Sequence, residues 1–327
     1  SGESDVVQLD YTFEADSGGI SSIGKYYWMV SENELQLFRL PLGTRTANWV
    51  FLDSNSDPIQ IYVVNEVFIH HKRRLLVGLR LPNGQGQLRI IDPVNGSTLR
   101  IIRLPHFIPT SIEGLVSSFH PFNSYSEEKK IFFKAPVSIG TNRGQVLIID
   151  LFHEPGYTRV DVEAEEVITE GYDSSSDLRQ IWNHPYIVLD QDEYGKEIPS
   201  RRTSITATKF TEDKKIGRVL FVGTEEGSIE IWSLERLQRL LRVQPKSKRA
   251  AISSFAITNE STTGSLLITF GPLDKTRNDI LGLPQTISDI KLFTVKFSVD
   301  ESPSLLYTGY SRSLRSSRDD KKAKSSR

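Results

Sequence analysis

The stretch 223–234, with the sequence Gly-Thr-Glu-Glu-Gly-Ser-Ile-Glu-Ile-Trp-Ser-Leu, limits the fold more than any other part of this chain. It follows a short apolar run and joins it through an acidic turn to a second apolar segment. Gly227 can adopt the positive φ that tight hairpin turns require. Ile229 and Ile231 alternate with polar residues, as a half-buried strand requires. The pattern predicts two adjacent antiparallel strands, the middle pair of a β-propeller blade.

Segments similar to the second of these strands recur along the chain, and each has further strand-like segments around it. The similar segments are 34–39, 87–92, 145–150, 228–233 and 289–294. The apolar strands that precede them are 26–30, 75–79, 131–139, 219–223 and 266–270. Extended segments that follow them are 49–52, 98–104, 160–168, 240–243 and 305–310, and strands further upstream are 62–69, 204–210 and 252–258. Four strands per unit is the composition of a propeller blade.

The repeat predicts an all-β chain, a β-propeller of WD-repeat type with about five blades visible. The units are about 50 to 80 residues apart, against roughly 40 to 45 in typical WD repeats, because the connecting loops are unequal. Propellers close with 4 to 8 blades. We therefore expect an incomplete seven-bladed propeller, and the alternative is a small closed ring of five blades.

The domain organisation follows from this repeat. We expect an N-terminal segment at 1–22, a propeller at 23–310 and a disordered tail at 311–327 that holds seven basic and two acidic residues. A long inserted loop is expected at about 171–202. Helix-like spacing occurs only at 177–182 and 234–241, and the second of these is better explained as a turn between two strands.

Composition excludes several classes of protein. The chain has no cysteine, which excludes a disulfide scaffold, a thiolate zinc site and a cysteine nucleophile. Its formal net charge of −1 gives no global attraction to nucleic acid or membranes. No apolar run reaches the roughly 18 residues of a membrane span. We expect no membrane span and no small-molecule substrate.

No catalytic or cofactor-binding constellation is recognisable. The six histidines, at positions 70, 71, 106, 120, 153 and 184, lack metal-ligand spacing, and adjacent strand residues point to opposite faces. The acidic residues Glu163, Glu165 and Glu166 are best explained as a solvated strand edge. We therefore expect a protein that is not an enzyme and that has no catalytic residues, metal or cofactor. A propeller hydrolase would need inward-facing carboxylates or histidines at the central channel.

Loops carry most binding residues of rigid scaffolds, so the charged loops are the candidate partner-binding sites. The residues are Lys72, Arg73 and Arg74; Tyr172, Asp173 and Asp177; and Lys246, Lys248 and Arg249. The basic tail could contact phosphate backbones, but it could equally be a linker or a localisation signal.

Several segments, in order, resemble the ELYS nucleoporins, the AT-hook-containing nuclear pore assembly proteins. The segment 64–79, Val-Asn-Glu-Val-Phe-Ile-His-His-Lys-Arg-Arg-Leu-Leu-Val-Gly-Leu, resembles the second blade of that family, where a His-Lys-Arg turn leads into Leu-Leu-Ile-Gly-Leu. Segments 144–151, 162–164, 166–169 and 227–232 are similar to later family stretches, and the ordered match spans about 23–310.

The resemblance implies a non-enzymatic interaction module of an ELYS-like nucleoporin, located in the nucleus at the pore, the nuclear envelope and chromatin. It implies a part in nuclear pore complex assembly, with proteins of the Y-shaped scaffold subcomplex as partners. Chromatin-binding elements of the family, including the AT-hook, lie downstream of the propeller, and this chain has no Arg-Gly-Arg core in its tail. Chromatin or DNA contact is thus expected only through the missing downstream region of a longer parent. The alternative is a generic WD-repeat scaffold of another complex, in trafficking or ubiquitin ligation.

Overall fold

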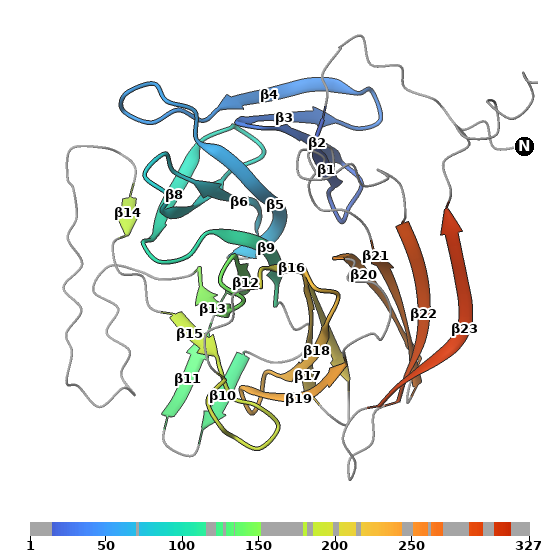
Figure 1. Cartoon of the computed structure of the whole chain (residues 1–327). Helices are drawn as coiled ribbons and strands as arrows, with labels where there is room; N and C mark the ends of the chain where they lie inside the picture. Colours follow the sequence, from blue (N-terminus) through green and yellow to red (C-terminus); the bar gives the residue numbers. More distant parts are fainter. Residues whose placement is uncertain are drawn as a thin grey trace, which may run out of the picture. The chain divides into compact units, whose positions relative to one another are not determined.

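The computed structural model of the chain describes residues 15–69, 72–115, 122–126, 129–133, 135–151, 179–181, 186–198, 203–213, 217–243, 251–260, 263–270, 288–296 and 304–314. All regular elements in these ranges are β-strands, most of them in four-stranded antiparallel sheets (Figure 1). Two compact units are present, and each is described by itself. The first comprises Ser1–Phe122, Ile131–Asn142 and Leu147–Val188, and the second comprises Asn123–Lys130, Arg143–Val146 and Leu189–Arg327.

Three sheets lie in the first unit, except that two end residues of the third sheet, Val146 and Leu189, belong to the second unit. Sheet one has the order β1 (Ser17–Ile20), β2 (Tyr26–Ser31), β3 (Glu34–Arg39), β4 (Thr44–Val50). Sheet two has β5 (Gln60–Ile69), β6 (Lys72–Arg80), β7 (Gly86–Ile91), β8 (Thr98–Leu104) and then β14 (Arg179–Ile181), which is parallel to β8. Sheet three has β9 (Pro109–Gly114), β12 (Pro136–Thr141), β13 (Val146–Asp150) and β15 (Tyr186–Leu189). A separate hairpin pairs β10 (Phe122–Ser126) with β11 (Lys129–Phe133).

Two further sheets lie in the second unit, and both keep chain order. The fourth sheet has β16 (Ile205–Asp213), β17 (Gly217–Thr224), β18 (Ile229–Ser233) and β19 (Gln238–Val243). The fifth sheet has β20 (Ile252–Glu260), β21 (Thr263–Phe270), β22 (Ser288–Lys296) and β23 (Ser304–Leu314).

Neighbouring sheets meet through their first strands, which is how propeller blades are arranged. In the first unit β5 contacts both β1 and β9, and in the second unit β16 contacts β20. Hydrogen bonds reinforce these contacts: the Asn65 side chain donates to the Ile112 carbonyl over 2.7 Å, and the Thr206 hydroxyl donates to the Ile252 carbonyl over 2.6 Å. The sheets are therefore blades, and the predicted all-β propeller architecture is confirmed.

The hairpin predicted within 219–233 forms. Strands β17 and β18 pair from Val219 with Ser233 to Gly223 with Ile229, and Gly227 takes a φ of 81°. The prediction of a half-buried second strand was wrong, because all five residues of β18 are buried, including Glu230. Blades cover both faces of their middle strands, so the alternation of polar and apolar residues does not mark a solvated face here.

The element boundaries differ from the predictions at several places. Strand β1 lies inside the segment expected to precede the propeller, and its Gly19 leaves room for the Trp28 ring, which a Cβ would approach to 2.2 Å. The single strand expected at 131–139 is divided into β11 and β12, with Pro136 at the first position of β12, where a missing N–H is tolerated. Strand β23 continues to Leu314, four residues into the expected tail, and 315–327 lie outside the described residues.

Two further expectations concern connecting segments. The segment 234–237 is a turn before β19, as expected, whereas 179–181, which has helix-like spacing, is the strand β14. The expected downstream strand at 160–168 lies outside the described residues, and β15 is the fourth strand of the third blade.

Candidate functional site

The three consecutive cations Lys72, Arg73 and Arg74 begin strand β6 and do not lie in a loop, contrary to the sequence-based expectation. Strand β6 starts early because Lys72 pairs with Ile69 and Arg73 with Phe68 in the ladder with β5. Successive side chains of a strand point to opposite faces. Arg73 therefore lies on one face of the second blade, while Lys72 and Arg74 share the other.

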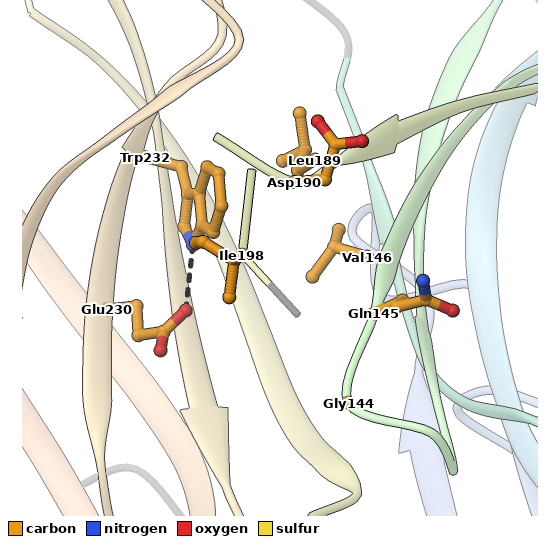
Figure 2. A pocket seen from close by; sticks show the side chains of 8 residues that line it. All are labelled: Gly144, Gln145, Val146, Leu189, Asp190, Ile198, Glu230 and Trp232. Atoms are coloured by element: carbon orange, nitrogen blue, oxygen red, sulfur yellow. Dashed lines mark hydrogen bonds between the residues drawn. The ribbon is translucent and has the colours of Figure 1, made fainter. Parts of the chain in front are cut away.

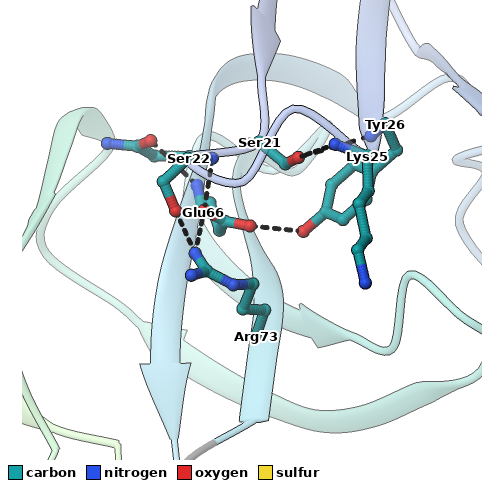
Figure 3. Close-up of polar contacts among 7 residues, drawn as sticks. Ser21, Ser22, Lys25, Tyr26, Glu66 and Arg73 are labelled. Carbon is teal, nitrogen blue, oxygen red and sulfur yellow. Dashed lines mark hydrogen bonds and ion pairs between the residues drawn. The ribbon is translucent and has the colours of Figure 1, made fainter. Parts of the chain in front are cut away.

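Arg73 belongs to a polar cluster that connects the second blade to the first (Figure 3). The Glu66 carboxylate accepts hydrogen bonds from the Ser22 amide at 2.9 Å, the Ser22 hydroxyl at 2.6 Å and the Tyr26 hydroxyl at 2.6 Å. Arg73 completes the cluster with a 2.9 Å ion pair to Glu66 and lies over the Phe68 ring, 4.7 Å from its centroid. Only 8% of the Glu66 side chain is exposed, and its partners come from both blades, so this carboxylate links the two blades and is itself little accessible to a partner.

The surroundings shift the pKa values of two members of this cluster. Burial raises the pKa of the Tyr26 hydroxyl, and the hydrogen bond to Glu66 and the charge of that carboxylate raise it further. Burial alone would raise the pKa of Glu66, but the hydrogen bonds from Ser22 and Tyr26 and the charge of Arg73 outweigh it, so this pKa is lowered. Both shifts favour a neutral tyrosine that donates to an ionised glutamate at neutral pH.

Lys72 and Arg74 line an open pocket of about 350 Å³ on the other face of the second blade. Its lining residues are Ile69, Lys72, Arg74, Ile90, Leu99, Arg100 and Leu151. They come from β5, β6, β7 and β8 and from the residue that follows β13. Three lining residues are cations, four are apolar, and none is acidic, so the pocket combines cationic side chains with an apolar wall.

The cations of the pocket are held in place by the blade. Arg74 lies 3.2 Å from the Asp92 carboxylate, and 13% and 14% of the two side chains are exposed. Arg100 donates from Nη1 to the Leu151 carbonyl over 2.9 Å, and Lys72 is exposed. We call this feature the blade-two pocket. Of its cations, Lys72 and Arg74 were predicted from sequence, whereas Arg100 was not, because its position resembles an ordinary polar position in a strand.

The second unit contains a charge cluster around the buried Glu230, and Figure 2 shows the hydrogen bond between Glu230 and Trp232. The carboxylate of Glu230 accepts a hydrogen bond from Trp232 Nε1 at 3.1 Å, and it lies 3.6 Å from both Arg239 and Arg242. Arg239 also pairs with Glu193 at 2.8 Å. Glu230 and Arg242 lie opposite each other in the β18–β19 ladder. Opposite charges at facing positions of a predicted hairpin are the sequence pattern that could have indicated this cluster.

A cavity of about 20 Å³ adjoins this cluster and is lined by Gly144, Gln145, Val146, Leu189, Asp190, Ile198, Glu230 and Trp232 (Figure 2). That volume suits about one water molecule and no larger ligand. The Glu230 carboxylate is already paired with two arginines, and the adjoining cavity is too small for a ligand, so this cluster is a poor candidate for a binding site.

The other predicted site residues, Tyr172, Asp173, Asp177, Lys246, Lys248 and Arg249, lie outside the described residues. His106 lies exposed in the turn after β8, where its ring meets Phe107 edge to face. Among the residues that the structure describes, no group of three or more His, Cys, Asp or Glu side chains is placed to hold a metal ion. The described residues also form no helix that is long and apolar enough to cross a membrane.

No protein-family model matches the sequence, and no curated protein matches it as a relative. Solved structures do resemble it. The β-propeller domain of Cps50 (Swd1) from Myceliophteria thermophila matches with a TM-score of 0.51 and 12% identity over 92% of this chain and 72% of that one. A functionally unknown protein from Desulfotomaculum acetoxidans matches with a TM-score of 0.51 and 11% identity over 94% and 73%. At such identities the likeness establishes the fold alone: the chain is a β-propeller.

Proposed function

We propose that this chain is a non-enzymatic protein-interaction module, a propeller of WD-repeat type in an ELYS-like nucleoporin. In this proposal it contributes to nuclear pore complex assembly and to docking at the nuclear envelope and chromatin. Its partners are proteins of the Y-shaped pore scaffold subcomplex. Contact with chromatin is left to the downstream region of the parent protein.

The blade-two pocket is the observation that carries the interaction part of this proposal. It is open, and its cations extend from strands that are paired on both sides within the second blade. Rigid elements that present a few charged and apolar groups suit recognition of another protein. The pore-specific part draws its support from the ordered sequence resemblance, which includes the segment that forms β5 and β6.

Proximity labelling with the tagged parent protein in cells tests the proposal. Enrichment of pore scaffold subunits over a tag-only control supports it. Enrichment of vesicle-coat or ubiquitin-ligase subunits instead, without pore scaffold subunits, would contradict it and favour a generic WD-repeat scaffold.

A further inference from the structure

We propose that the blade-two pocket binds an acidic, extended segment of a protein partner, in which an apolar side chain is flanked by carboxylates. The inference rests on the proposed function, because it names the kind of partner segment that the interaction module would take. Neither the sequence resemblance nor the similar structures assign a ligand to this pocket.

Charge complementarity is the first argument for an acidic occupant. Lys72, Arg74 and Arg100 are the charged residues of the lining, and Arg74 is paired with Asp92. Arginine and lysine at the wall of a concave site favour carboxylates of a partner. Lys72 is the most exposed of the three, so a partner can pair with it without displacing an internal contact.

The apolar wall is the second argument, and it favours a peptide over a nucleic acid. Ile69, Ile90, Leu99 and Leu151 line the same pocket as the cations, and Leu99 is 39% exposed. The volume of about 350 Å³ is at the lower end of the range for ligand pockets and accommodates one or two apolar side chains. A phosphate backbone would use the cations but would gain nothing from the exposed apolar side chain of Leu99.

Pre-organisation is the third argument. The Leu151 carbonyl fixes the guanidinium of Arg100, and the Asp92 carboxylate fixes that of Arg74. Side chains that are already ordered lose little entropy on binding, which favours affinity. The parallel pairing of β14 with β8, with Arg179 opposite Arg100, further supports the strand from which Arg100 extends.

Fluorescence anisotropy with a short fluorescein-labelled peptide of alternating Glu and Leu tests the inference on the full chain. We expect saturable binding that Lys72→Glu weakens roughly tenfold, since one attraction becomes a repulsion. The matched control is Lys25→Glu, which makes the same charge change at an exposed turn residue outside the pocket and should bind like the wild type. Peptides with Gln for Glu, or with Ser for Leu, should each bind at least several-fold more weakly.

Several outcomes would overturn the inference. One is absence of binding to a folded chain, and another is equal weakening by both lysine variants. A duplex DNA that binds through Lys72 while the peptide does not would assign the pocket to nucleic acid. If the peptide binds only after Glu163, Glu165 and Glu166 are changed to Gln, the occupant of the pocket is the chain's own acidic stretch and not a segment of a partner. If the peptide fails but the parent still enriches pore scaffold subunits, only this inference fails and the proposed function stands.

Discussion

Replacement of Glu66 by alanine should destabilise the first unit by about 3 kcal/mol, and the reason lies in the cluster that joins the first two blades. The most protected bond is that from the Tyr26 hydroxyl at 2.6 Å, and a hydrogen bond to a charged group contributes roughly 1.5–3 kcal/mol. The contacts with Ser22 and Arg73 are more open to water, with Arg73 25% exposed, so together they add about 1 kcal/mol. Glu66→Gln, which keeps the shape of the side chain, should lose about half as much as Glu66→Ala, roughly 1.5 kcal/mol.

Urea titration followed by tryptophan fluorescence and far-UV circular dichroism measures this loss, provided that the two signals give one transition. Trp28 is a suitable reporter because its ring centroid lies 6.3 Å from that of Tyr26. Glu226→Ala, at an exposed turn position, is the matched control and should change stability by less than about 0.5 kcal/mol. The double-mutant cycle of Tyr26→Phe with Glu66→Ala should give a coupling of roughly 1.5 kcal/mol. A coupling near zero, or a Glu66→Ala variant as stable as the control, would refute the role assigned to the cluster.

Three further predictions follow from the same structure. Because the pKa of Glu66 is lowered in the folded chain, the ionised Glu66 contributes its full stabilisation above pH 4.5, the ordinary pKa, and loses it as the pH falls through the folded-state pKa. The difference in unfolding free energy between wild type and Glu66→Gln should therefore shrink between pH 7 and pH 3. A constant difference would contradict this. Because the pKa of Tyr26 is raised above 10.0, Tyr26→Phe should remove no phenolate absorbance from the folded chain between pH 9 and 11, and a loss of one tyrosine equivalent would contradict it. Gly223→Ala should cost about 1–3 kcal/mol in urea unfolding, because its Cβ would lie 2.7 Å from Ile252 Cγ2, whereas Gly114→Ala, with no atom within 4 Å of its Cβ, should stay within about 0.5 kcal/mol.

The strands of the blades were largely predictable from sequence because the signals that define them are local. Strands β3 and β8 have the bounds that alternation and turn residues gave, 34–39 and 98–104. The hairpin of β17 and β18 was equally clear, since Gly227 meets the need for a positive φ and the flanking residues are apolar. Strand β1 was missed because its two glycines carry no strand signal, and Trp28, whose ring requires Gly19 and whose carbonyl oxygen lies against Gly18, is on another strand.

The candidate site was predictable only in part, because a pocket depends on contacts between distant residues. Lys72 and Arg74 were identified as candidates, but their strand was expected to begin only at Leu75. The partners of its first residues lie elsewhere in the sequence: Arg73 pairs with Glu66 of β5, and Arg74 pairs with Asp92, which follows β7. Leu151 contributes to the pocket from beyond β13, and no local pattern connects it to Lys72.

Burial of Glu230 illustrates a second limit. The rule that a polar residue in an alternating strand faces water assumes that one face of the sheet is solvated. Both faces of β18 are covered, and Arg239 and Arg242 supply the opposite charges that make a buried carboxylate tolerable. An acidic residue opposite arginine in a predicted hairpin is the pattern that would have indicated this arrangement.

Biolayer interferometry of the purified chain against a reconstituted Y-shaped pore scaffold subcomplex measures the proposed interaction itself. We expect saturable binding by the wild type and by Lys25→Glu, and roughly tenfold weaker binding by Lys72→Glu. Absence of binding by a chain whose circular dichroism shows intact β-structure would contradict the proposed function.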